Sequence, residues 1–176
     1  MYNREAEDRL PHRLVCYAES SDGIRWRKPI VGAHEFRGSR ENNISATTAP
    51  GTVFIDPQAP PAERYKYFGR NRVAMLDNRI AGAGLWVYAS PDGRSFQPMY
   101  GRPATRFLSD THDVAFWDPV IDKYVAYIKY IGYFDSEGER VRPELPHGVR
   151  EGRKLWRMTT DRLDQWPEPE LVLAMD

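Results

Sequence analysis

Residues 17–26 read YAESSDGIRW, and residues 88–96 repeat the same pattern as YASPDGRSF. A third, more degenerate copy, RMTTDRLDQW, occupies residues 157–166. Each copy has an apolar run, small hydroxyl residues, an Asp, a turn and then an aromatic residue. Asp-Gly between two apolar runs is a strong hairpin signal, because Gly adopts positive φ without strain and Asp accepts hydrogen bonds from its local backbone. The motif therefore predicts three β-hairpins.

The hairpins predict local roles for their Asp and aromatic residues. We expect Asp22 and Asp92 to accept hydrogen bonds within their own turns, since turn-forming Asp is far commoner than catalytic Asp. In the third copy the equivalent position is Asp161. Trp26 and Phe96 follow the first two turns, and we expect them to fold back and to be buried against their hairpins.

A second unit lies between the hairpins. Residues 52–57 read TVFIDP and lead to the run YKYF at 65–68, and residues 114–119 read VAFWDP and lead to YVAYI at 124–128. Each unit is predicted to be a buried strand, an Asp-Pro turn and a second strand. Pro57 and Pro119 end the first strands because proline cannot donate a hydrogen bond to a sheet. This pattern assigns Asp56 and Asp118 to structural turns.

The two units together give four strands per repeat, and the hairpin Asp residues recur at intervals of about 70 positions. Four-stranded sheets repeating at a long fixed period are typical of β-propeller blades. The predicted fold is therefore all-β, with about two and a half blades of a propeller and under about 10% helix. Residues 12–48 are the outer part of one blade, 49–108 a second blade and 109–176 a third. A β-sandwich is the alternative, but it does not require the same units to recur in order.

Composition narrows the range of partners. Lys plus Arg and Asp plus Glu both number 25, so the formal net charge is zero, and nothing electrostatic favours nucleic acid or an anionic membrane. No apolar stretch reaches the ~20 residues of a membrane helix. The basic cluster Arg150, Arg153, Lys154 and Arg157 is interrupted by Glu151 and is predicted to be a solvated surface.

Cysteine and histidine usage predicts neither a metal nor a cofactor. Cys16 is the only cysteine, which excludes an intrachain disulfide, and its place in the apolar run LVCYA predicts a small buried thiol. His12, His34, His112 and His147 show no metal-ligand spacing. The sequence has neither a phosphate-binding Gly-rich loop nor a Gly-x-Ser-x-Gly nucleophile motif.

The beginning of the sequence carries no secretory signal. Residues 2–10 are mostly charged and lack the apolar core that a signal peptide needs. They also precede an incomplete repeat, so the start reads as an internal position in a longer chain. The sequence therefore leaves the compartment open.

Four strings carry a family resemblance: SSDGIRW at 20–26, GTVFIDP at 51–57, FWDP at 116–119 and WPEPE at 166–170. Over nearly its whole length the chain is similar to uncharacterised bacterial proteins of the five-bladed β-propeller glycoside hydrolase superfamily, related to the arabinanase/xylosidase and invertase/levanase families. The resemblance implies an oligosaccharide or polysaccharide partner and a secreted or periplasmic location. Its motifs are more specific for the architecture than for the chemistry.

In those hydrolases acidic residues project into a central funnel from the inner strands of successive blades. One carboxylic acid protonates the leaving oxygen, and another carboxylate attacks the sugar or activates water. Here the string SDTHD at 109–113 leads into an inner strand, so the resemblance implies Asp113 and His112 as catalytic candidates and Asp110 as a sugar-binding candidate. A loop in which His112 and Asp113 cap the strand is the structural alternative.

Four further residues are weaker candidates. Asp56 and Asp118 are alternative acids, because invertase-like enzymes carry a functional Asp-Pro pair; there the pair precedes its strand, whereas here it follows one. Asn42 and Asn43 offer amide groups to a sugar, or equally form a turn. The strand at 52–55 has no acid just upstream, and the family's first catalytic carboxylate would lie before Met1.

Three functions stay open from the sequence. The first is a glycoside hydrolase-like propeller segment that acts on carbohydrate or derives from a protein that does; whether this chain is active alone stays open. The second is a non-catalytic carbohydrate-binding module that stacks Trp and Tyr faces on sugar rings. The third is a structural fragment that assembles with copies of itself. Since even four blades need about 280 residues, we expect either a homo-oligomer or a part of a longer chain.

Overall fold

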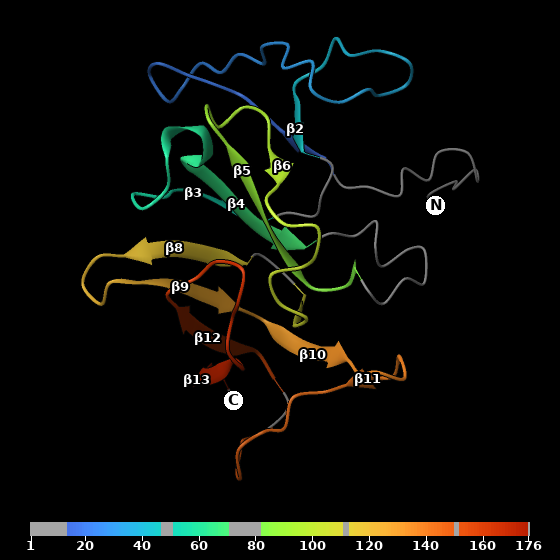
Figure 1. The fold of residues 1–176 in the computed structure, drawn as a ribbon, viewed down its shortest axis with the longest axis vertical. Coiled ribbons are helices and arrows are strands. Elements are labelled where there is room, and N and C mark those ends of the chain that lie inside the picture. The colour runs from blue at the N-terminus through green and yellow to red at the C-terminus, as the bar shows by residue number, and fades with distance from the viewer. Residues whose placement is uncertain (1–13, 47–50, 71–81, 111–112, 150–151, 176) are drawn as a thin grey trace.

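A computed structural model describes residues 14–46, 51–70, 82–110, 113–149 and 152–175. The fold is all-β, as predicted, and the strands pair antiparallel in several sheets (Figure 1). In the described part of the chain the helical element is the 3-10 turn η1, Pro61–Glu63. Among these residues no helix is long and apolar enough to cross a membrane.

The strands of the described ranges belong to four sheets, two of them four-stranded. The N-terminal pair is β1 and β2, and the first four-stranded sheet has the order β3-β4-β5-β6. The second has the order β8-β9-β12-β13, and a three-stranded sheet has the order β7-β10-β11. The bounds are β1 Val15–Cys16, β2 Ile44–Ala46, β3 Gly51–Ile55, β4 Tyr65–Arg70, β5 Leu85–Ser90, β6 Gln97–Pro98, β7 Leu108–Ser109, β8 Val114–Asp118, β9 Lys123–Ile128, β10 Tyr130–Phe134, β11 Arg140–Val141, β12 Lys154–Thr160 and β13 Glu170–Ala174.

The first four-stranded sheet is a simple meander in which each strand pairs with the next along the chain. Residues 51–55 of β3 pair with residues 65–69 of β4, and all six residues of β4 pair with β5. The predicted order of strand, Asp-Pro turn and strand is therefore confirmed for β3 and β4. The predicted burial of the first strand is wrong, because no residue of β3 is buried and Val53 and Ile55 are exposed. The Asp-Gly hairpin then joins β5 to the short outer strand β6.

The second four-stranded sheet repeats this order with an insertion. β8 pairs with β9, β9 with β12 and β12 with β13, so the predicted strands at 114–118 and 124–128 are confirmed. Between β9 and β12 the chain forms the hairpin β10–β11, and β10 also pairs with β7. The sequence patterns did not predict this inserted three-stranded sheet.

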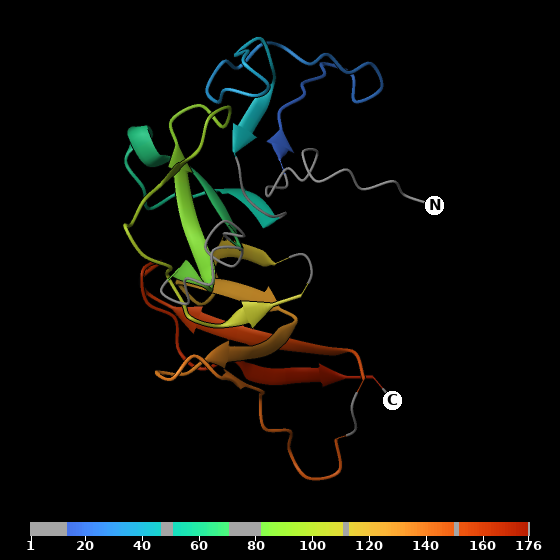
Figure 2. The ribbon, with the colours of Figure 1, turned by 90° about the vertical axis from the view of Figure 1, so that its right-hand side faces the viewer.

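The sheets lie one against the next along the long axis of the molecule (Figures 1 and 2). The larger apolar core lies between the two four-stranded sheets and joins Phe68 and Leu85 of the first to Ala126 and Trp156 of the second. A smaller core lies between the first of these sheets and the N-terminal segment; Tyr67 and Tyr88 pack there beside Phe96. The first four-stranded sheet is thus covered on both faces.

The two Asp-Gly turns have the predicted hydrogen bonds. Asp22 accepts from the N–H groups of Ile24 and Arg25 at 2.9 and 2.8 Å, and Asp92 accepts from the N–H of Arg94 at 2.9 Å. These backbone donors are the main reason why the pKa of each carboxyl group lies below its usual value. Both Asp residues are therefore turn residues.

The two aromatic residues after these turns differ in burial. Phe96 is 3% exposed and packs beside Tyr67, with 5.9 Å between the ring centroids, as predicted. Trp26 is 63% exposed, so its predicted burial is wrong. Its indole N–H donates to the carbonyl of Gly23 within the turn, but the described sheets do not cover its ring.

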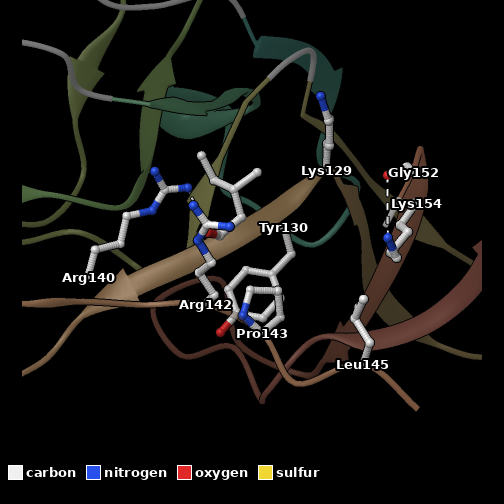
Figure 3. Close-up of a pocket in the computed structure, with 9 residues that line it drawn as sticks. Lys129, Tyr130, Arg140, Arg142, Pro143, Leu145, Gly152 and Lys154 are labelled. Carbon is white, nitrogen blue, oxygen red and sulfur yellow. Dashed lines mark hydrogen bonds between the residues drawn. The ribbon is translucent and has the colours of Figure 1, made fainter. Parts of the chain in front are cut away.

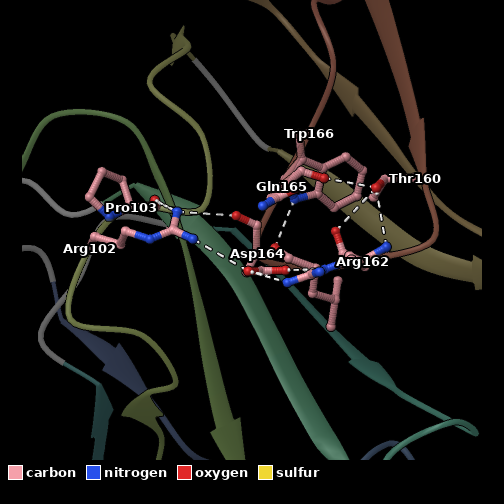
Figure 4. Close-up of polar contacts among 8 residues, drawn as sticks. Arg102, Pro103, Thr160, Arg162, Asp164, Gln165 and Trp166 are labelled. Atoms are coloured by element: carbon pink, nitrogen blue, oxygen red, sulfur yellow. Dashed lines mark hydrogen bonds and ion pairs between the residues drawn. The ribbon is translucent and has the colours of Figure 1, made fainter.

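The third copy of the hairpin motif closes differently. The Thr160 hydroxyl accepts from the N–H of Arg162 at 3.1 Å and donates to the carbonyl of Gln165 at 2.8 Å (Figure 4). Asp161 instead forms an exposed ion pair with Lys123 at 2.7 Å. Thr160, rather than Asp161, is therefore the turn-forming side chain of this copy.

The thiol of Cys16 is exposed, which contradicts the sequence prediction of a buried thiol. Cys16 lies in β1, a strand of only two residues that pairs with β2 across a register shift. Val15, its neighbour in β1, packs toward the smaller core. Because successive residues of a strand point to opposite faces, Cys16 then points away from that core.

Candidate active site

Asp113 lies immediately before β8, the strand that begins the second four-stranded sheet. This strand contacts β3, the corresponding strand of the first four-stranded sheet. The hydroxyl of Thr52 in β3 donates a hydrogen bond to the main-chain carbonyl of Asp113. The start of β8 is therefore fixed against β3 at the place where Asp113 begins the strand.

The Asp113 carboxyl group is buried without a close hydrogen-bond partner. The residue has no exposed surface, and neither of its carboxylate oxygens has a hydrogen-bond partner of good geometry. Burial raises the pKa of this group to about 7, because the charged form loses the stabilisation that water gives it. Asp113 is therefore half protonated near neutral pH.

Two polar side chains moderate this effect. Ser109, the last residue of β7, and Arg70, the last residue of β4, both act to lower the pKa of Asp113. The hydroxyl of Ser109 has no hydrogen bond of good geometry itself, so its contact with the carboxyl group is looser than a hydrogen bond. Tyr67 of β4 also lies near; its pKa is raised chiefly by burial and then by Tyr88 and Asp113.

Asp110 has the opposite environment to Asp113. Its side chain is half exposed and forms an ion pair with the Nζ of Lys129 at 2.6 Å. This contact, with smaller contributions from Arg70 and Arg140, lowers the pKa of the Asp110 carboxyl group. Two carboxyl groups three residues apart thus differ in protonation at neutral pH.

This contrast suits acid–base chemistry. A carboxyl group whose pKa lies near the working pH can donate a proton to a leaving oxygen, and an ionised carboxylate can serve as a base or nucleophile. Asp113 fits the first role by its raised pKa, but its carboxyl group has no exposed surface, so a local opening has to precede contact with a substrate. Asp110 fits the second by its charge, although Lys129 occupies one of its oxygens.

The predicted amide ligands Asn42 and Asn43 hold the N-terminal segment together. The amide nitrogen of Asn42 donates to the carbonyls of His34 and Ser39, and its oxygen accepts from the N–H of Ile44. The amide nitrogen of Asn43 donates to the carbonyl of Tyr17. Of the two interpretations left open by the sequence, the structure shows the turn and segment contacts.

The alternative acids lie at the C-terminal ends of β3 and β8. Asp118 is the last residue of β8 and accepts from the N–H of Val120 at 2.9 Å. Asp56 follows β3, is 2% exposed, and accepts from the hydroxyl of Tyr124 and the N–H of Gln58. Both are turn residues, and the length of β8 separates Asp118 from Asp113.

His112 lies outside the described residues, so its predicted role with Asp113 stays a prediction. Within the described ranges no three His, Cys, Asp or Glu side chains lie close enough together to hold a metal ion. The sequence patterns did not single out Arg70, Ser109 or Tyr67. Of these three residues only Arg70 could have been noticed in the sequence, because it is a charged residue close to the end of a predicted strand.

Comparisons with known proteins leave the site to be interpreted from its own geometry. The chain matches no protein-family model, and the comparisons with curated proteins and with solved structures gave no match either.

Proposed function

We propose that this chain is a segment of a β-propeller that binds and cleaves carbohydrate, with Asp113 as the general acid. The observation that carries the proposal is the buried carboxyl group at the head of β8, whose pKa of about 7 keeps it partly protonated near neutral pH. A glycosidase needs such an acid to protonate the oxygen of the leaving sugar.

The arrangement of sheets supports the propeller part of the proposal. Two four-stranded antiparallel sheets with the same strand order face each other across one apolar core. The first strands of both sheets, β3 and β8, are in contact, as the inner strands of neighbouring blades are near a propeller axis. The N-terminal pair β1–β2 would then belong to a preceding blade and the sheet of β8 to a following one.

The position of Asp113 supports the catalytic part. The residue precedes an inner strand, which is where the resemblance to five-bladed hydrolases implies that catalytic acids lie. Asp110, ionised beside Lys129, supplies a carboxylate on the same segment. A pair of carboxyl groups whose environments push their pKa values apart is the usual sign of an acid and its partner.

The test is turnover of a panel of aryl-glycosides by the wild type and by two variants. We expect Asp113→Asn to lower turnover by at least about 100-fold, the usual loss when a general acid is removed. Asp118→Asn is the matched control, because Asp118 lies at the opposite end of the same strand, and it should keep its rate within about twofold. Unchanged turnover in Asp113→Asn would overturn the proposed role.

One observation favours a second function, carbohydrate binding without cleavage. The 63% exposed ring of Trp26 borders a pocket of about 560 Å³ that Glu19, Ser20, Arg25 and Arg27 also line. An exposed indole beside polar side chains is a suitable platform for a sugar ring. Saturable polysaccharide binding that Trp26→Ala abolishes, with no cleavage by the wild type, would favour this second function.

A further inference from the structure

A second pocket lies on the inserted sheet, between β10–β11 and the start of β12. It has a volume of about 290 Å³ (Figure 3). Four of its nine lining residues are cationic, and the described lining contains no carboxylate. The cationic residues are Lys129, Arg140, Arg142 and Lys154. In a chain of zero net charge, this is a local concentration of positive charge.

Arg140 and Arg142 form no ion pair with any carboxylate of the described residues. Lys129 pairs with Asp110, which lies outside the lining. Arg140 uses one N–H group to bind the carbonyl of Ile131 at 2.8 Å, which leaves its other donors available. Arg142 forms no hydrogen bond or ion pair with any of the described residues. Its guanidinium group is therefore available to a ligand.

The local chain geometry keeps Arg140 and Arg142 on the same side. Arg140 belongs to β11 and Arg142 follows directly after this strand, and both side chains line the pocket. Figure 3 shows the side chains of Arg140 and Arg142 together on one side of Tyr130. Two cations that line one pocket repel each other, and an oxyanion bound between them would relieve the repulsion and accept paired hydrogen bonds.

The remaining walls suit a ring rather than a bare ion. Tyr130, Ile131, Pro143 and Leu145 add apolar surface beside the cations. The volume lies near the lower limit of small-molecule sites, about 300 Å³. One sugar ring that carries an acidic group would use both the apolar walls and the two guanidinium groups.

The pocket also adjoins the candidate active site. Lys129 lines the pocket and binds Asp110, three residues before Asp113. The charges of Arg70 and Arg140 both act on the carboxylate of Asp110. Arg70 also acts on Asp113, and Arg140 lines the pocket. A ligand in the pocket therefore lies beside the segment that carries both carboxyl groups.

We propose that this pocket binds the carboxylate of an acidic sugar unit, so that the carbohydrate is a uronic-acid-containing one. The carbohydrate part of this inference rests on the proposed function, but binding at the pocket does not require cleavage at Asp113.

The test is a titration of the whole chain with D-glucuronate, followed by NMR, with D-glucose as the neutral probe. We expect glucuronate to bind and glucose not to bind at the same concentrations.

Arg142→Gln should weaken glucuronate binding by at least about tenfold, the usual effect of losing a hydrogen bond to a charged group. Arg153→Gln is the matched control: Arg153 is exposed and close in sequence to Lys154, but does not line the pocket. It should bind glucuronate within about twofold of the wild type.

Three results would overturn the inference. These are binding of glucose as tight as that of glucuronate, wild-type affinity in Arg142→Gln, and competition by inorganic sulfate with equal affinity, which would make the pocket a general anion site. The two proposals fail separately. Cleavage of neutral glycosides that depends on Asp113, without glucuronate binding, overturns only this inference. Glucuronate binding that depends on Arg142, without any cleavage, overturns only the catalytic role of Asp113.

Discussion

At the scale of the residue, four Asp side chains of this chain illustrate three environments. In Asp22 and Asp92 the carboxylate accepts backbone N–H groups and its pKa is lowered. Asp56 is buried, and the hydroxyl of Tyr124 and a backbone N–H bind it. Asp113 is buried without such donors. Sequence patterns predicted the turn residues because their hydrogen bonds are local; the burial of Asp113 depends on other strands.

The raised pKa of Asp113 predicts a pH-dependent stability. Between its ordinary value of 3.8 and about 7, the folded protein keeps a proton on Asp113 that the unfolded chain has lost. Raising the pH through this range therefore favours the unfolded chain, by up to about 1.4 kcal/mol per pH unit. Asp113→Asn removes this penalty, so its stability relative to the wild type should grow up to pH 7 and then stay constant.

Urea unfolding of the two proteins at several pH values measures this difference. Because all other titrating groups are shared, their contributions cancel in the comparison. A difference that does not change with pH would show that Asp113 titrates normally in the folded protein.

The Asp-Gly turns give a smaller, local prediction. Asp92→Ala removes the acceptor for the N–H of Arg94 and should lower the free energy of unfolding by about 1 kcal/mol. Ligand binding should not change. Thermal unfolding monitored by circular dichroism checks the first expectation, and a loss of ligand binding at an unchanged melting temperature would contradict the second.

At the scale of the element, the sequence predicted the repeated strands well and the insertion poorly. The strands near 52–55, 65–68, 114–118 and 124–128 were predicted because apolar runs and Asp-Pro turns mark them locally. The hairpin β10–β11 lacks such a marker, and β7 has only two residues. Trp26 and Cys16 were placed wrongly because their burial depends on which sheet covers them, and no local pattern contains that information.

The twin Asp-Pro turns permit a matched comparison. The buried carboxylate of Asp56 binds Tyr124 of the neighbouring sheet and lies 3.8 Å from the Nζ of buried Lys66. Asp56→Ala should therefore cost up to about 3 kcal/mol, because it leaves the buried hydroxyl of Tyr124 without its acceptor. It also removes one of the two carboxylates beside Lys66, of which Glu63 remains. Asp118→Ala loses one turn hydrogen bond and should cost about 1 kcal/mol or less. Equal losses in the two variants would contradict a role for Asp56 in joining the sheets.

At the scale of the whole molecule, the outer face of the second four-stranded sheet exposes apolar side chains beside charged ones such as Arg157 and Glu170. Leu155 lies opposite Leu173 on this face and both are partly exposed, as is Val114. A stack of blades buries such a face against the next one. We therefore expect the isolated chain to self-associate at micromolar concentration.

Light scattering measures this association. The double variant L155E/L173E should reduce this self-association, because two negative charges that face each other would be costly to bury between copies of the chain. V120E is the control, since Val120 lies exposed in the turn after β8 and not on this face. A stable monomer that melts cooperatively would contradict the expectation and weaken the proposed propeller architecture.

The most direct test of the proposed function is the pH dependence of kcat/KM for the aryl-glycoside that the chain cleaves fastest. If Asp113 is the general acid, kcat/KM should be constant below its pKa of about 7 and fall tenfold per pH unit above it. Asp113→Asn should lose this dependence together with most of its activity. A wild-type profile that stays flat from pH 6 to about pH 9, or the absence of any glycoside cleavage, would contradict the proposal.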